Sequence, residues 1–245
     1  MKATFFKDNI EWQVTTAQET WTQGDQVSGE IKLKNHSPQS ITLENPGLAL
    51  TYTDIKKVQA RETLKPLVME KISLSSIGGG EEASFSFSLK LPDNCPVTDK
   101  KSSFYLSFGP NSTESHLQLN ILPLEIFTKV ISLFDTFFRF KVKDIKGVKA
   151  GVEYKLTPPT SRDFANVEQL LLEMQMKEEI LILNFKFSVK KLDMSGISTK
   201  MMKENVKESL SLTPKEYSLG RGMIHQDQLL KSIESVLNKI KANTF

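Results

Sequence analysis

The residues best suited to metal chemistry are three histidines, His36, His116 and His225, and the single cysteine, Cys95. Zinc sites usually place such ligands in close pairs along the chain, because neighbouring positions can then reach one ion. No two of these residues have that spacing. The sequence therefore predicts no metal site, and His116 is interpreted as an ordinary side chain of a strand.

Phosphate binding and nucleophilic catalysis also lack their usual motifs. The glycine cluster Gly78-Gly79-Gly80 is followed by Glu81-Glu82, whose carboxylates repel phosphate, and not by the lysine and hydroxyl residue of a P-loop. No G-x-S-x-G elbow occurs, and no neighbour in the sequence would activate the Cys95 thiol. The acidic pairs, Glu81-Glu82 and Glu178-Glu179, fit solvated turns better than a pair of catalytic carboxylates. We therefore expect no cofactor and no enzymatic activity. An enzyme site assembled from residues far apart in the sequence stays an alternative.

Positive charge gathers on one predicted strand face, where it could bind an anion. The residues that carry it are Arg139, Lys141, Lys143 and Lys149, and the apolar side chains between them face the other way. Two interpretations stay open. The face is either simply solvated, or it binds an anionic protein partner or an acidic membrane surface.

A second candidate surface lies on a predicted helix over residues 227–241, which Asp227 would cap. Its apolar residues recur with the period of a helix, and they are Leu229, Leu230, Ile233, Val236, Leu237 and Ile240. The stripe either packs on its own domain or docks on a partner or a membrane. In the second case, Leu230, Ile233 and Leu237 are the expected contacts.

Residues 1–121 are predicted to form an antiparallel β-sandwich. Apolar and polar residues alternate with the period of a half-buried strand, and turn residues separate the segments. These segments are 10–14, 27–34, 48–52, 68–74, 85–91, 104–108 and 116–121. A parallel sheet is disfavoured because the crossover helices that it requires are absent from this pattern.

Residues 122–136 are predicted to form a helical linker, since Phe127, Val130, Ile131 and Phe134 fall on one helical stripe. Strand patterns resume over 137–143 and 151–156, and continue in a long hairpin of 167–176 with 180–192 and in a short strand at 209–213. Residues 169–176 taken alone also fit a helix, which stays an alternative for that segment. The predicted fold class is therefore all-β: two tandem antiparallel β-sandwich domains, the second (137–245) reduced and closed by the terminal helix.

The composition of the chain indicates which kinds of partner and which cellular compartment to expect. The chain has 245 residues, of which 39% are hydrophobic and 25% charged, and this balance is typical of a globular protein. The net charge of +3 is small for a nucleic-acid-binding protein, so we expect no nucleic-acid partner. No apolar segment has the length of a signal peptide or a membrane span, and the single cysteine fits a reducing compartment. These features predict a cytoplasmic protein.

The segment from Trp21 to Leu33 resembles the N-terminal domain of the arrestin family. It has an aromatic residue, a Gly-acid turn at Gly24-Asp25, and then the pattern Val-x-Gly-x-Ile-x-Leu, in which Gly29 suggests a bulge or a close backbone approach. The segment Phe85 to Pro92, with Pro96 after it, is similar to a second segment of that family. In layout the chain is most similar to the bacterial arrestin-like proteins of the sporulation-control group.

This resemblance implies two sandwiches that act as a scaffold or adaptor for other proteins. The polar-core charges and phosphate-sensing lysines of receptor-binding arrestins have no counterparts that can be placed in this sequence. The expected function is therefore a non-enzymatic, cytoplasmic adaptor that binds protein partners in regulation or trafficking. The alternative is a peripheral membrane module that binds anionic lipid through the basic strand face and the terminal helix.

Overall fold

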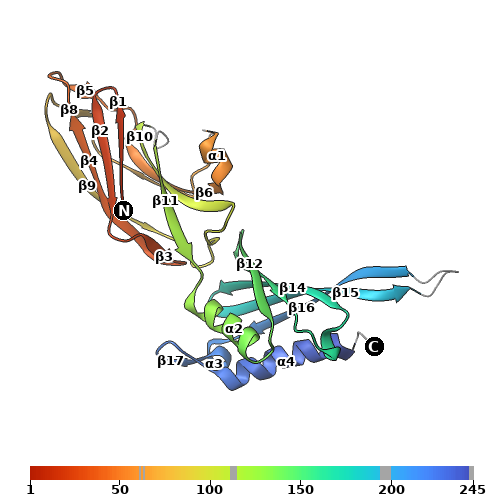
Figure 1. Ribbon diagram of the computed structural model, residues 1–245. Coiled ribbons are helices and arrows are strands. Elements are labelled where there is room, and N and C mark those ends of the chain that lie inside the picture. Colours follow the sequence, from red (N-terminus) through yellow and green to blue (C-terminus); the bar gives the residue numbers. More distant parts are fainter. Residues whose placement is uncertain (61, 63, 111–114, 194–199, 243–245) are drawn as a thin grey trace. The chain divides into compact units, whose positions relative to one another are not determined.

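The fold was analysed in a computed structural model, which describes residues 1–60, 62, 64–110, 115–193 and 200–242 (Figure 1). The chain divides into two compact units, Met1–Leu122 and Pro123–Phe245. Strands dominate both units, which confirms the predicted all-β class.

The described part of the first unit contains two main sheets and a short α-helix. Its strands are β1 (Lys2–Lys7), β2 (Ile10–Thr16), β3 (Thr20–Thr22), β4 (Gln26–Asn35), β5 (Ile41–Thr42), β6 (Gly47–Asp54), β7 (Val68–Lys71), β8 (Ser76–Ile77), β9 (Glu82–Lys90), β10 (Ser102–Gly109) and β11 (Ser115–Leu122), and α1 spans Ile55–Gln59. One sheet has the order β1-β2-β4-β9 and the other β3-β11-β10-β6-β7, while β5 pairs with β8. Every strand predicted for this half is present.

The two main sheets of the first unit share one core, as a sandwich requires. Trp12, Ile31 and Phe87 come from one sheet, Phe104 and Leu119 from the other, and all five belong to a single buried cluster. Their alternation along each strand is the pattern that predicted the sandwich.

Two glycines of the segment from Trp21 to Leu33 have clear backbone roles. Gly24 has a φ of +83°, a conformation that glycine adopts without strain. A Cβ atom at Gly29 would lie 2.1 Å from the carbonyl oxygen of Thr15, so the paired backbones of β2 and β4 approach closely there. The expected close approach at Gly29 is therefore present, without a bulge in the register of β2 and β4.

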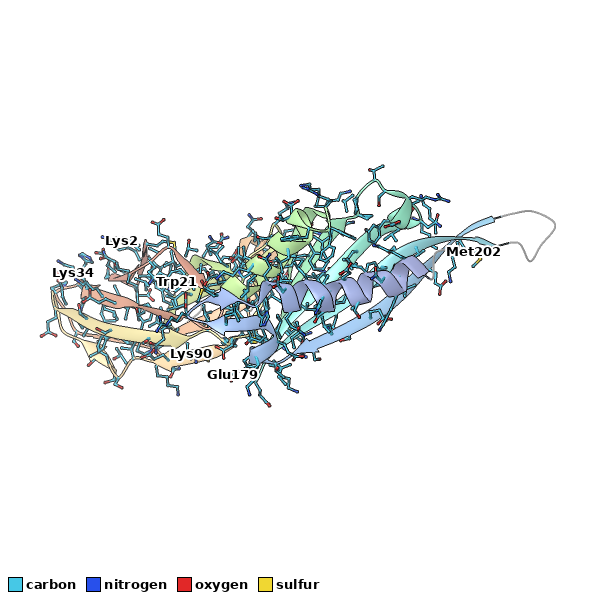
Figure 2. The ribbon with its side chains drawn as sticks, turned by 90° about the horizontal axis from the view of Figure 1, so that it is seen from below. Lys2, Trp21, Lys34, Lys90, Glu179 and Met202 are labelled. Atoms are coloured by element: carbon cyan, nitrogen blue, oxygen red, sulfur yellow. The ribbon has the colours of Figure 1, made fainter. Side chains whose placement is uncertain are left out.

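The main sheet of the second unit is five-stranded and antiparallel, in the order β12-β13-β14-β15-β16, and β17 pairs with β18 in a separate two-stranded sheet. Its elements are α2 (Glu125–Thr136), β12 (Lys141–Val148), β13 (Gly151–Thr157), β14 (Val167–Lys177), β15 (Ile180–Asp193), β16 (Lys200–Leu212), α3 (Pro214–Tyr217), β17 (Ser218–Gly220), β18 (Met223–Ile224) and α4 (Gln226–Ala242). Figure 2 labels two residues of this unit: Glu179, in the turn between β14 and β15, and Met202, near the start of β16.

Helices, not a second sheet, cover the inner face of this sheet. Phe134 of α2 lies 6.3 Å from Phe185 of β15 between ring centroids, and Lys239 of α4 binds Glu208 of β16 at 3.0 Å. Glu208 is directly opposite Phe185 in the register, so both helices lie on the same face (Figure 1). The facing layer of the expected second sandwich is therefore helical, because the apolar stripes of α2 and α4 supply the surface that a second sheet would have provided.

Helix α2 belongs to the second unit, although the sequence predicts a linker there. Its residues Phe127, Val130, Leu133 and Phe134 are buried. The Phe134 ring also packs edge-on against Phe140, with 5.9 Å between centroids. The helix is thus part of a hydrophobic core.

Candidate functional site

The residues considered for metal or nucleophilic chemistry do not form such a site. Among the described residues, no group of three or more His, Cys, Asp or Glu side chains is placed to hold a metal ion. The Nε2 atom of His36 lies 2.9 Å from a Glu11 carboxylate oxygen, and Nδ1 of His116 lies 2.8 Å from Ser107 Oγ. Burial lowers the pKa of His116, which favours its neutral form.

Cys95 is buried in the first unit, with 3% of its surface exposed. Burial is the main reason that the pKa of its thiol is raised to about 12. A thiol is reactive as the thiolate, which this environment disfavours. Cys95 therefore behaves as a small core residue.

The outer face of the second sheet, opposite the helices, carries a shallow hollow. It is lined by residues of β13, β14, β15 and β16, including Glu153, Glu173, Lys186 and Lys207. By register Glu153 is directly opposite Glu173, and Lys186 is directly opposite Lys207, so the acidic and the basic side chains form two separate rows across the strands. Because the hollow is lined by both charges, it favours no ligand of one charge.

The basic residues predicted as a binding face lie along and beside strand β12. The strand begins at Lys141 and not at residue 137, because the chain turns first: Arg139 has a φ of +60° and Phe140 points into the core. The predicted strand over 137–143 is therefore shortened at its start. Packing of Phe140 against Phe134 and Phe164 accounts for this difference, since it overrides the β-propensity of the local sequence.

These basic residues do not form the single predicted face. Lys141 pairs with Thr157 across the β12–β13 ladder, whereas Lys143 lies at a β-bulge between Val142 and Asp144. Lys149 follows the strand, about 26 Å from Lys141 along an extended chain. The structure adds Lys146, which is exposed and directly opposite Glu153.

Strand β12 carries three lysines and one carboxylate, Asp144, and most of the lysines have no ion pair among the described residues. Lys141 forms an ion pair with Asp135. Among the described residues, Arg139, Lys143, Lys146 and Lys149 have no ion pair. All four side chains are exposed, so the positive charge of this strand is available to an anionic partner.

Exposed apolar side chains accompany this charge, and sequence reasoning did not identify them. Phe137 is 49% exposed, Val142 42% and Ile145 38%. By register, Val142 and Ile145 point to the side of the buried residues Leu156 and Tyr154. They are exposed because β12 is the edge strand, a position that alternation alone does not reveal.

The terminal helix α4 packs within the chain. Ile233 and Leu237 are fully buried, and Leu230 is half-buried. These side chains cannot contact a partner while the helix is packed, so they form no part of the candidate surface. Within the described residues, no helix is long and apolar enough to cross a membrane.

Comparison with known proteins bears on the fold. Neither the protein-family models nor the curated proteins searched contain a match. Spo0M, a sporulation control protein from Bacillus subtilis, superposes with a TM-score of 0.62 at 15% sequence identity, and the alignment covers 98% of this chain and 100% of that one. The chain has a Spo0M-like fold. At this identity the likeness to Spo0M concerns the fold alone.

Partial similarities to two other proteins carry no argument, because their TM-scores are below 0.3. They are a β-glucosidase from Listeria innocua (TM-score 0.29, 13% identity, 48% of this chain and 17% of that one) and the C-terminal domain of wzt (TM-score 0.28, 13% identity, 49% and 78%).

Proposed function

We propose that this chain is a non-enzymatic, cytoplasmic adaptor of arrestin-like type that binds an acidic protein partner in a regulatory process. The main support for the proposal is the exposure of strand β12. Its residues 141–146 are all exposed, and they include apolar side chains together with lysines that have no ion pair. Interfaces of this kind gain specificity from complementary charge and affinity from buried apolar surface.

The regulatory part of the proposal is supported by two similarities. The N-terminal strands carry the arrestin-like sequence pattern, and the whole chain has the fold of a protein described as a sporulation control protein. One fold can host many functions, so these similarities only guide the proposal. The proposal must be tested with variants of the β12 surface.

A protein partner is favoured over a membrane surface. The membrane hypothesis depends on an apolar helix face that could enter the lipid interface. In α4 that face is buried, so only the β12 surface, with the exposed Phe137, Val142 and Ile145, could attract a bilayer. Electrostatic attraction supplemented by so few apolar side chains would give weak adsorption that salt screens.

The test compares partner capture by the full chain with capture by two variants of equal charge change. Both variants replace three lysines or arginines of the second unit with glutamate. The β12 variant is Arg139→Glu, Lys143→Glu and Lys146→Glu, and the control is Lys177→Glu, Lys186→Glu and Lys207→Glu. Circular dichroism first verifies that both variants are folded.

We expect quantitative mass spectrometry to identify at least one protein that the wild type and the control retain and the β12 variant loses by about tenfold, or 1.4 kcal/mol. Equal capture by both variants would contradict the proposed site. Flotation of the wild type with anionic vesicles in physiological salt, without such a protein, would instead support the membrane hypothesis.

A further inference from the structure

Strand β9 lies at one edge of its sheet in the first unit, and among the described strands it pairs with β4 alone (Figure 1). Just before the strand, the N–H group of Asn35 donates to the carbonyl oxygen of Glu81 at 3.0 Å. Just after it, the N–H group of Leu91 donates to the carbonyl oxygen of Asp25 at 2.9 Å. Hydrogen-bonded pairs recur at every second residue of an antiparallel ladder, so the odd-numbered residues of β9 bond to β4. The backbone N–H and C=O groups of the even-numbered residues therefore point away from the sheet.

These outward-pointing groups lie along the middle of the strand, at Ser84, Ser86 and Ser88. Within the described part of the chain, no backbone or side-chain hydrogen bond of these three serines reaches an element other than β4. Their side chains are exposed on the outer face of the sheet. An edge with unpaired backbone groups is a template for pairing with another strand, so β9 can accept one.

Strand β9 also lacks the features that usually keep an edge from pairing. Such features are a short length, a bulge, a proline or charged side chains along the edge. The strand has nine residues in regular register with β4, and no charged residue or proline lies between Glu82 and Lys90. By contrast, β16, an edge strand of the second unit, has two lysines and two glutamates over residues 203–208. The composition of β9 therefore favours an edge that is paired.

We propose that β9 pairs with β9 of a second copy of this chain, antiparallel and with a twofold axis at Ser86. Glu82 of one copy then lies opposite Lys90 of the other, at both ends of the paired stretch. Ser84 likewise lies opposite Ser88. All these residues are even-numbered, so the pairing uses the backbone groups that point away from β4. The two four-stranded sheets become one sheet of eight strands, and a twofold interface leaves neither β9 edge open.

The side chains favour a second copy in this register. Opposite charges directly across a strand pair stabilise it, and any other antiparallel register separates Glu82 from Lys90 of the other copy. Glu82 already forms an ion pair with Lys34 of its own sheet, so Lys90 of the second copy adds another cation beside the same carboxylate. On the inner face, the half-buried Phe85 lies opposite Phe87 of the other copy, which extends the apolar core across the interface. The inference goes beyond the proposed function, because it concerns the first unit and does not involve β12.

The test measures the mass of the full chain by sedimentation and its amide hydrogen exchange by nuclear magnetic resonance. We expect a dimer that dissociates on dilution. At a chain concentration about ten times the dissociation constant, the amides of Ser84, Ser86 and Ser88 should exchange about fivefold more slowly than in the monomer. The amides of Phe85 and Phe87, which bond to β4, are the internal control and should change less. A chain that is monomeric at every concentration, or a dimer that leaves the serine amides unprotected, would overturn the proposal.

The substitution Ser86→Lys places two like charges together at the twofold axis, so it should weaken dimerisation by about fivefold. The matched control is Ser28→Lys. Ser28 is exposed on β4, directly opposite Ser88, so the same charge is added to the same face one strand away from the edge. This control should dimerise like the wild type. Equal weakening by both substitutions would contradict pairing through the β9 edge.

Two charge variants test the register itself. Glu82→Lys and Lys90→Glu each place like charges opposite one another in a homodimer, so each variant alone should dimerise about fivefold more weakly than the wild type. In an equal mixture, the lysine introduced at position 82 of one copy lies opposite the glutamate introduced at position 90 of the other. The mixture should therefore dimerise as well as the wild type, a gain that misfolded variants cannot give. No gain on mixing would overturn the proposed pairing.

Discussion

His116 shows how one side chain can make the stability of the first unit depend on pH. The residue lies on β11, directly opposite Ser107 of β10, and its Nδ1 atom contacts Ser107 Oγ. Burial lowers the pKa of His116 from the usual 6.5, so the folded chain binds a proton there less readily than the unfolded chain. The contribution of the neutral His116 side chain to the free energy of unfolding is complete above about pH 6.5. It is lost as the pH falls towards the lowered pKa of the folded chain.

We therefore expect the thermal midpoint of the first unit to fall between pH 7.5 and pH 5.5. The variant His116→Gln keeps a hydrogen-bonding group near Ser107 without a titrating ring, so its midpoint should fall by less over the same range. Tryptophan fluorescence is a selective readout, because the two tryptophans, Trp12 and Trp21, are both buried in the first unit. An equal fall in wild type and variant would show that other groups cause the dependence.

At the residue scale, the sequence predicted a group of exposed basic side chains correctly, but it did not predict how far apart these side chains lie. Arg139, Lys141, Lys143 and Lys149 were identified as basic, and all four are exposed. Their separation could not be predicted, because the turn at Arg139 depends on Phe140 packing against residues far away in the chain. Lys146 and Ile145 matter only because β12 is an edge strand, which is a property of the sheet and not of the local sequence.

Individual elements were predicted most reliably where the periodicity was long. The hairpin of β14 and β15 was expected at 167–176 and 180–192, and it forms over Val167–Lys177 and Ile180–Asp193. The helix expected at 227–241 forms over Gln226–Ala242. By contrast, the three-residue strand β3 and the five-residue helix α1 were missed, since segments this short contain fewer than two full periods of the strand or helix pattern.

The turn between β14 and β15 gives an element-scale prediction. Glu178 and Glu179 both have positive φ values, 49° and 65°, a combination that favours Asn-Gly in a two-residue hairpin turn. Replacing the pair with Asn-Gly should stabilise the second unit by about 1 kcal/mol, because it relieves backbone strain. Urea unfolding followed by circular dichroism measures the change. The variant Glu178→Ala with Glu179→Ala removes the same charges and keeps the strain, so a similar gain in it would assign the effect to charge.

Helix α4 gives a second prediction at this scale, because its apolar stripe is part of the core. Ile233 is fully buried, so Ile233→Ala should reduce the free energy of unfolding of the second unit by about 3 kcal/mol. Lys231 is exposed on the same helix, and Lys231→Ala should change that free energy by less than about 0.5 kcal/mol. Equal, small effects of both substitutions in urea titrations would mean that the helix is not packed in solution.

On the scale of the whole chain, the number of units was predictable but their internal construction was not. The change of pattern near Leu122-Pro123 marks the division between the two units, and β3 pairs with β11 up to Leu122. The sequence could not show that α2 packs on the sheet that follows it. An amphipathic helix has the same pattern whether it covers its own domain or connects two domains.

The place of α2 leads to a prediction about fragments. A fragment of residues 123–245 contains both helices that cover the inner face of the sheet, so it should fold cooperatively by itself. A fragment of residues 137–245 lacks the Phe134 ring that contacts Phe140 and Phe185, and also the buried Phe127 and Val130. In this shorter fragment the apolar side chains that α2 covers would be exposed to water, so the fragment should be unfolded or aggregated. Thermal unfolding and size-exclusion chromatography separate the outcomes, with fragment 1–122 as the matched control for the first unit. Equal stability of 123–245 and 137–245 would show that α2 acts as a linker after all.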